Sequence, residues 1–353
     1  MKRISYKDEK VSIGIDVHKN HYTVSCMVMG RVVEKATLRP NPTKLVAYIN
    51  SRFEGAAEIL SGYEAGFSGF NLHRVLESAG INNIVVNAGS IEVASRDRVK
   101  TDRRDSIKIA SLLECGRLRG IRIPSRSEEL ARLLHRTRGQ LVKDRSRVVN
   151  RIKMRLFQFG VDIPETIKEA TFDELVSTPG MEAELKFSLE KHVSQWKFLN
   201  KDIKEIKKKQ EQLAESDPLY QIYYSIPGYG LQTALMISKE LGDMRQFKSE
   251  RNLFSFVGLT PTERSSGDTI HKGHISRQGS PGLRCVLIEA AWVAVAKDPY
   301  WKHEYQKKAL KIGGKRAIVA IARRLLGVAR ALVRKGELYQ VQEILQKETK
   351  ESC

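Results

Sequence analysis

The chain has 353 residues, enough for two or three domains, and its 41% apolar content excludes wholesale disorder. Its formal net charge is +20, from 61 Lys and Arg against 41 Asp and Glu, so we expect a polyanionic partner. An anionic membrane surface is the competing interpretation. We expect no membrane partner, because the sequence has no signal-peptide pattern and no apolar run of about 18 residues.

Residues 1–124 alternate between strand and helix patterns, which predicts an α/β domain with a sheet of mixed strand directions. The first three strands are expected at 11–17, 22–29 and 31–38, as an antiparallel meander. Two more strands are expected at 56–64 and 82–87. Helices are expected from about residue 43, at 68–79 and at 105–118, before an exit linker at 120–126.

Asp16 lies within the first predicted strand, where apolar residues alternate with small or charged ones. A carboxylate is costly to bury unless a positive charge meets it. The pattern is compatible with an exposed strand face and with a metal ligand. In the second case, the small residues Ser12 and Gly14 would leave room on that face for metal and phosphate.

Residues 125–217 are expected to form long helical arms. Apolar residues follow one side of 127–158, namely Leu130, Leu134, Leu141, Val148, Ile152 and Leu156. A heptad pattern follows in 185–213, with Leu185, Leu189, His192, Trp196, Leu199, Ile203, Ile206, Gln210 and Leu213. The segment 160–180, with Pro164, separates them. The pattern predicts an antiparallel helical hairpin, or coiled-coil arms that pair with another protomer.

The first arm is strongly basic. Residues 126–159 contain ten Lys and Arg against three Asp and Glu. A solvated helix face is the simpler interpretation, but so large an excess favours a phosphate-binding arm. The candidate nucleic-acid contacts are Arg136, Arg138, Lys143, Arg147 and Arg151.

Residues 218–353 are expected to be mainly α-helical. The stretch 223–247 has two helical patterns around a Pro-Gly-x-Gly turn, typical of a helix-hairpin-helix element whose backbone amides meet phosphate. A polar, glycine-rich loop is expected at 265–285, overlapping a helix at 283–296, and a basic amphipathic helix lies within 306–335. A membrane-surface helix would look similar. The candidate nucleic-acid contacts here are Gly228, Gly230, Lys272, Arg277, Arg284, Arg323 and Arg324.

Some residues with chemical potential have a simpler explanation. His271 and His274 have metal-compatible spacing, but no Cys or acid completes such a site, so a solvated loop is preferred. The tyrosines at 223, 224 and 229 are more easily explained by packing or exposure than by base stacking. The cysteines Cys26, Cys115, Cys285 and Cys353 form no C-x-x-C pair, which predicts reduced thiols and a cytoplasmic protein.

Four carboxylates stand at strand ends or helix starts of the first domain: Asp16, Glu64, Asp102 and Asp105. The last two lie three residues apart at a helix start, where capping is an alternative role. As a set of hard oxygen ligands, the four suit Mg²⁺ or Mn²⁺. Two such ions about 3.5–4 Å apart can clamp a phosphodiester.

The stretches "IGIDVHKN", "YEAG" and "KTDRRD" together resemble the N-terminal RNase H-like, RuvC-type domain of the DEDD transposases. This insertion-sequence family includes the Piv DNA invertases. The stretches "SIPGYGLQTALMISKELGDMRQF", "FVGLTPTERSSGD" and "ISRQGSPGLRCVLIEAAW" resemble that family's C-terminal transposase domain. The resemblance covers nearly the whole chain and implies a DNA transposase or site-specific recombinase.

The resemblance also implies roles for individual residues. Asp16, Glu64, Asp102 and Asp105 would coordinate Mg²⁺, and Ser266 would attack the scissile phosphate. Ser265 is adjacent, and the choice between the two serines stays open. The implied partners are double-stranded donor and target DNA and a structured guide RNA encoded by the element. The heptad pattern and the need to cut several strands further suggest a dimer or tetramer, with a site shared between protomers.

Two rival functions remain. A RuvC-like, metal-dependent nuclease would use the same carboxylates with water and would not need Ser266. A non-catalytic nucleic-acid-binding protein would tolerate loss of Asp16 and Asp102. Both explain the charge, but only a recombinase explains the carboxylates, the serine pair and the helical hairpin together.

Overall fold

A computed structural model describes residues 6–87, 89, 91, 101–162, 169–177, 180–266 and 269–340. The chain divides into two compact units, Met1–Ile123 and Pro124–Cys353. The sequence predicted a first domain of 1–124, and the predicted 125–217 and 218–353 segments both lie in the second unit. Among the described residues, no helix has the length and apolar character needed to span a membrane.

The first unit is built on a five-stranded sheet of order β3-β2-β1-β4-β5. The strands are β1 Lys10–Val17, β2 Tyr22–Val28, β3 Arg31–Leu38, β4 Glu58–Glu64 and β5 Asn82–Val86. β2 pairs antiparallel with β1 and β3, whereas β1, β4 and β5 run parallel. The predicted mixed sheet with its initial meander is therefore confirmed.

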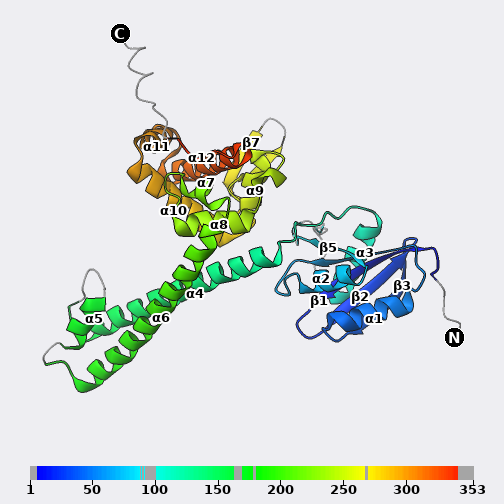
Figure 1. The fold of residues 1–353 in the computed structure, drawn as a ribbon, viewed down its shortest axis with the longest axis horizontal. Coiled ribbons are helices and arrows are strands. Elements are labelled where there is room, and N and C mark those ends of the chain that lie inside the picture. The colour runs from blue at the N-terminus through cyan, green and yellow to red at the C-terminus, as the bar shows by residue number, and fades with distance from the viewer. Residues whose placement is uncertain are drawn as a thin grey trace, which may run out of the picture. The chain divides into compact units, whose positions relative to one another are not determined.

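Helices cover both faces of this sheet. The helices α1 (Pro42–Arg52) and α2 (Asn71–Ser78) lie on one face (Figure 1). Their apolar side chains and those of the strands form a buried core there. The helix α3 (Asp102–Glu114) covers the other face and packs on β1, β2 and β4. Strand residues of the first face, such as Ile13, Ile15 and Tyr63, have no exposed surface.

The α3 helix comes unusually close to β1 because of Gly14. A Cβ atom on Gly14 would lie 2.0 Å from the carbonyl oxygen of Ser106 and 2.5 Å from the backbone nitrogen of Ala110. Beside it, the hydroxyl oxygens of Ser25 and Ser106 are 2.8 Å apart. The room that Gly14 leaves is filled by the helix backbone, so its expected role in making space for metal and phosphate is wrong.

The second unit begins with a helical hairpin. Its helices are α4 (Arg126–Gln158), the short α5 (Glu169–Val176) and α6 (Ala183–Glu215), and α4 packs along α6 (Figure 1). The two are antiparallel, because Arg145 donates to Asn200 at 2.8 Å and Arg151 lies opposite Gln195. The hairpin interpretation is confirmed within one chain.

The buried seam of the hairpin differs in detail from the predicted one. Val148, Ile152 and Leu156 of α4 pack against α6, but Leu130 is exposed. On α6, Val193 takes the buried position that the heptad assigned to His192.

The remaining elements form a helical domain with one β-hairpin. They are α7 Tyr220–Tyr224, α8 Leu231–Leu241, a 3₁₀ turn Met244–Gln246, α9 Glu250–Val257, β6 Pro261–Ser266, β7 Thr269–Ile275, α10 Pro281–Lys297, α11 Pro299–Ile312 and α12 Gly314–Lys335. The helix α12 lies in the core with Ile321, Leu325 and Leu326 fully buried. It is therefore a packing helix, and the alternative of a membrane-surface helix is not supported.

The expected loop at 265–285 is wrong in its first part. β6 and β7 pair antiparallel there, with Ser265 opposite Ile270 and Ser266 opposite Thr269. The pairing satisfies backbone amides and carbonyls without an apolar strand face, which is why the polar sequence gave no strand signal. His271 and His274 thus belong to a strand. Gly267 and Asp268, between the strands, lie outside the described residues.

Candidate active site

Asp16 and Glu64 stand side by side at one edge of the sheet. β1 and β4 are parallel, and the pair Ile15–Tyr63 precedes the two carboxylates on their strands. Strand side chains alternate between faces, so both acids point away from the face of buried Ile15 and Tyr63. They therefore share the face that α3 covers, and both are partly exposed.

The first turn of α3 reaches the same edge. The helix runs back along the sheet, because its last residue, Glu114, accepts a hydrogen bond at 2.9 Å from the backbone N–H of Gly30 in the β2–β3 turn. Its first residue, Asp102, lies 3.0 Å from the ring of His21 in the β1–β2 turn. Asp105 follows in the same turn of helix. The structure thus brings the four predicted carboxylates to one edge of one sheet.

The start of α3 also shows why its boundary was misplaced. The side chain of Thr101 caps the helix by accepting from the backbone N–H of Arg104. The helix therefore begins at Asp102, one turn before the predicted start at Asp105. Two acids in the first turn interact favourably with the helix dipole, so capping and metal binding are compatible roles for this pair.

His21 is a site residue that sequence reasoning missed. Its Nε2 atom lies 3.0 Å from Oδ2 of Asp102, and its ring stacks near that of His18, with centroids 4.9 Å apart. The partner of His21 is 81 residues away in the chain. No local pattern could reveal that contact. The only available signal was that two histidines flank the turn after the strand carrying Asp16.

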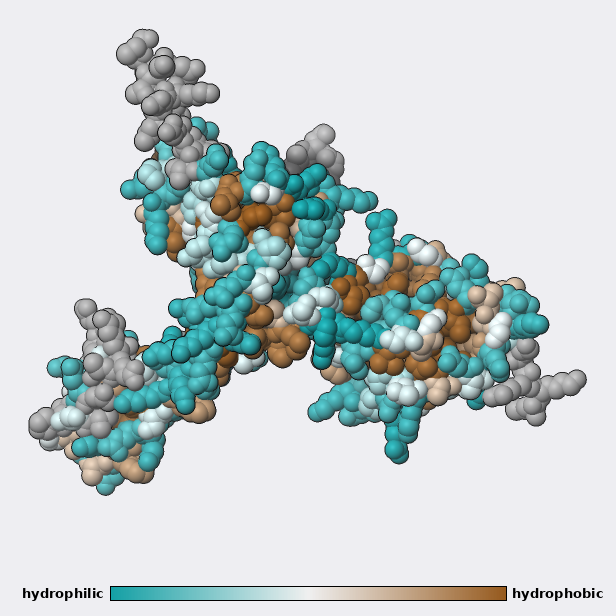
Figure 2. Space-filling model, in the orientation of Figure 1, coloured by the Kyte–Doolittle hydropathy of each residue, from teal (hydrophilic) through white to brown (hydrophobic). Residues whose placement is uncertain are grey.

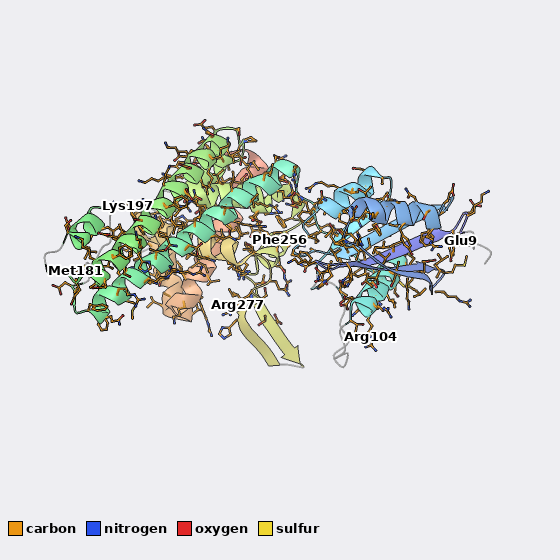
Figure 3. The ribbon with its side chains drawn as sticks, turned by 90° about the horizontal axis from the view of Figure 1, so that it is seen from below. Glu9, Arg104, Met181, Lys197, Phe256 and Arg277 are labelled. Carbon is orange, nitrogen blue, oxygen red and sulfur yellow. The ribbon has the colours of Figure 1, made fainter. Side chains whose placement is uncertain are left out.

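The two candidate serines lie in the second unit, on β6. Their backbone pairing with β7 is described, but their side chains lie outside the described residues. Arg277 follows β7 at the base of this hairpin and is exposed, with a positive φ of 56° (Figure 3).

Comparison with known proteins decides the family. The DEDD transposase model of the IS110 group matches residues 13–160, which include all four carboxylates. The model of the transposase IS116/IS110/IS902 family matches residues 220–306, which include both serines. The chain belongs to the IS110 family of transposases.

Relatives support this assignment over most of the chain. The transposase is 27% identical over 353 residues to the transposase for insertion sequence element IS1111A of Coxiella burnetii, covering 96% of this chain and 93% of that protein. It is 26% identical over 295 residues to the transposase for element IS1533 of Leptospira borgpetersenii, covering 80% and 85%. The chain is thus an enzyme that acts on DNA.

Membership of a DEDD transposase family indicates use of a divalent metal ion. The donor set fits a hard cation, since it consists of carboxylates gathered at one partly exposed edge. Within the described ranges, however, no group of three or more His, Cys, Asp or Glu is arranged to hold a metal ion. Binding an ion would require the carboxylates to rotate together, and Asp102 would have to share or leave its contact with His21.

The base of the serine hairpin in the transposase is held by Arg284. This residue is 9% exposed, and its guanidinium donates to the carbonyl oxygens of Val257, Gln278 and Gly279 at 3.2, 2.8 and 3.1 Å. Gly258 lets the chain pass so closely that a Cβ atom there would lie 1.9 Å from the oxygen of Gln278. Arg284 therefore anchors the hairpin, and its burial argues against the nucleic-acid contact predicted for it.

The basic arm has the features expected of a phosphate-binding surface. A shallow groove of about 600 Å³ lies on it, lined by Arg147, Asn150, Arg151, Met154, Arg155 and His192. Burial, and then the neighbouring Arg151 and Arg155, lower the pKa of His192. A local positive potential is what an incoming phosphate would meet.

The predicted contacts on the arm differ in how available they are. Lys143 is exposed, but Arg136 pairs with Glu240 at 3.1 Å and Arg147 pairs with Asp144 at 2.7 Å. Burial, and then Arg145, lower the pKa of Arg138. Figure 2 shows a hydrophilic surface along the helical hairpin. On α6, Lys197, Lys201, Lys204 and Lys208 line another shallow groove.

The candidates in the C-terminal part are mostly engaged in packing. Gly228, with φ of 83°, lies against α10, where a Cβ atom would come within 2.1 Å of the carbonyl oxygen of Ala290. Gly230 caps α8 and has open space around it. Arg323 lies over the ring of Phe254, and Arg324 bonds Glu304. The side chain of Lys272 lies outside the described residues.

The tyrosines follow the simpler explanation. Tyr223 and Tyr229 are buried, and burial raises the pKa of each hydroxyl. Tyr224 is 52% exposed and stacks on Tyr220.

Proposed function

We propose that this transposase cuts and rejoins DNA strands of an insertion sequence at the edge that carries Asp16, Glu64, Asp102 and Asp105. The observation that carries the proposal is the convergence of these four carboxylates from two parallel strands and one helix start. Mg²⁺ or Mn²⁺, two ions per site, would be held there by the carboxylates and would neutralise charge on the attacked phosphate.

The chain's own groups would prepare this edge for DNA. Arg103 and Arg104 are exposed in the first turn of α3, which also carries Asp102 and Asp105, so they can meet phosphate oxygens. Figure 3 shows the place of Arg104. Arginine forms two parallel hydrogen bonds to phosphate and offsets the repulsion between DNA and the acidic edge. His21 would hold Asp102 in place until a metal ion binds, when Asp102 must share or leave this contact.

The attacking group in this proposal is the hydroxyl of Ser266, with Ser265 as the alternative. Its oxygen would bond to phosphorus as the bond between phosphorus and a DNA oxygen breaks, and the serine proton would pass to the departing oxygen. The phosphoserine bond would conserve the energy needed to rejoin a strand. The support is the family match over the serine segment and its position on an anchored hairpin.

We extend the proposal to the partners. The serines and the carboxylates belong to different compact units, so a site shared between protomers of a dimer or tetramer is compatible with the fold. The charge of +20 and the basic groove on α4 suit two polyanions, double-stranded DNA and a structured guide RNA from the element. Such a protein would act in the cytoplasm.

The test compares two glutamates of one strand. Glu64→Gln is expected to lower metal-dependent DNA cleavage at least 100-fold and to weaken Mn²⁺ binding, measured by calorimetry without DNA. Glu58→Gln is the matched control, because Glu58 begins the same strand and pairs with Lys10 at 3.0 Å, away from the carboxylate edge. Equal cleavage by both variants would contradict the proposal.

Cleavage by Ser266→Ala and Ser265→Ala without a covalent adduct would instead support a nuclease that uses water.

A further inference from the structure

We propose that Phe67 stacks on a DNA base beside the phosphate that the transposase attacks. Phe67 lies in the turn directly after β4, three residues beyond Glu64, and its side chain is 73% exposed. The inference rests on the proposed function, since it needs DNA at the carboxylate edge. This contact would be made to a base, whereas the carboxylates and the metal ion would act only on the phosphate.

The turn that carries Phe67 is tied to the core of the unit. The hydroxyl of buried Tyr63 donates to the carbonyl oxygen of Gly69 at 3.0 Å and accepts from the backbone N–H of His73 at 3.3 Å. At the other end, Ala65 donates to the carbonyl oxygen of Val86 at 2.8 Å. Both ends of the turn are therefore anchored, and Phe67 is held outward by a defined backbone.

The turn contains a second phenylalanine that behaves differently. Phe70 packs against the apolar core between the sheet and α1 and α2. The residues around Phe67 are small, namely Ala65, Gly66, Ser68 and Gly69. One ring is thus packed and partly buried, while the other is left exposed to water, although burial would be favourable.

The charged groups at the edge that carries Phe67 favour a nucleic-acid base as its binding partner. The edge carries the four carboxylates and the exposed Arg103 and Arg104, whereas the core of a protein interface is depleted of charge. A nucleotide presents a flat π-face next to a phosphate, and the edge itself carries no such pair of groups. Aromatic side chains stack on any base, and phenylalanine also inserts between base steps to unstack them.

The experiment uses the full-length protein and DNA spanning the end of the insertion sequence, with 2-aminopurine placed in turn at each position around the junction. Ca²⁺ replaces Mg²⁺, so that the DNA is bound without being cut. The wild type is expected to change the fluorescence at one position. Phe67→Ala is expected to lose that change and to bind about 5- to 150-fold more weakly, while Phe67→Trp restores both.

Met29→Ala is the control, because Met29 is 77% exposed in the β2–β3 turn at the opposite edge of the same sheet. It is expected to retain the fluorescence change and the affinity. The thermal stability and Mn²⁺ binding of Phe67→Ala should equal those of the wild type, since the side chain is exposed and donates no ligand.

Two results would overturn the inference. One is an unaltered fluorescence change in Phe67→Ala. The other is a change in the oligomer mass of Phe67→Ala without DNA, which would make Phe67 a contact between protein copies. The Glu64→Gln variant distinguishes failure of this inference from failure of the proposed function. If Glu64→Gln loses cleavage and Phe67→Ala keeps the base signal, only the role of Phe67 is wrong.

Discussion

Gly14 and Gly62 allow α3 to lie directly on β1 and β4, the two strands that carry Asp16 and Glu64. A Cβ atom on Gly62 would touch Leu113 at 3.0 Å, a flexible side chain, whereas one on Gly14 would collide with helix backbone. The position of Asp102 and Asp105 at the carboxylate edge thus depends most on Gly14. A glycine in a strand is a sign of such close approach.

Gly14→Ala is expected to destabilise the first unit by about 1–3 kcal/mol or more, because backbone of α3 must move to accept the methyl group. Gly139→Ala is the control, since Gly139 has open space on α4 and alanine favours a helix by up to about 1 kcal/mol. Hydrogen exchange of β1 and α3 amides measures the effect on the first unit. Equal protection of these amides in wild type and Gly14→Ala would contradict it.

Cys26 makes the free energy of unfolding depend on pH in the alkaline range. Burial, and then the Glu34 carboxylate, raise the pKa of its thiol from 9.0 to about 12. The unfolded chain loses this proton near pH 9 while the native one keeps it. The stabilising contribution is therefore complete below pH 9 and is lost as the pH rises to about 12.

Cys26→Ala is expected to lose this part of the pH dependence, as measured by denaturant unfolding across that interval. In the native wild type, iodoacetamide should modify the exposed Cys115 and leave Cys26, whose side chain has no exposed surface. Peptide mapping that found both thiols modified at the same rate would refute the burial of Cys26.

At the scale of single residues, the four carboxylates could be proposed from the sequence because they lie in or at the end of predicted strands or at a helix start. It did not predict His21, whose role depends on a contact with Asp102 across 81 residues. It also assigned Arg284 to nucleic acid from its charge alone. Charge does not distinguish an exposed guanidinium from one that donates to three backbone carbonyls inside the fold.

The elements were predictable where hydrophobic periodicity was strong. The five strands and the helical hairpin follow from alternation and from three- and four-residue spacing. The β6–β7 hairpin lacks an apolar face, so its pairing could not be seen in the sequence. The burial of α12 could not be predicted either, because its arginines suggested a solvent face while Arg330 donates inward to the carbonyl oxygen of Phe247.

Trp196 is expected to be the main anchor of the helical hairpin. It is 7% exposed on α6 and packs edge-on against Phe172, with ring centroids 4.8 Å apart. Trp196→Ala should destabilise the hairpin by about 3–5 kcal/mol through the lost burial and the cavity left behind. Phe198→Ala, two residues away and 65% exposed, should change stability little. Similar melting curves for the two variants would contradict the packing.

At the scale of the whole molecule, the candidate metal-binding carboxylates and the candidate nucleophile belong to separate compact units. Each unit builds its own part: the sheet edge gathers the acids, and the anchored hairpin carries the serines. Neither unit alone has the groups for the proposed strand transfer. The proposed mechanism therefore requires both units, from one protomer or two, to reach the same phosphate.

Mapping the covalent bond between protein and DNA tests this account most directly. The full-length transposase is incubated with Mg²⁺, RNA from the flanks of the element and a suicide DNA substrate, and the digested complex is analysed by mass spectrometry. The account predicts a phosphoserine adduct on Ser266 or Ser265 that is absent from Asp16→Asn. Cut DNA with an adduct on neither serine would contradict it.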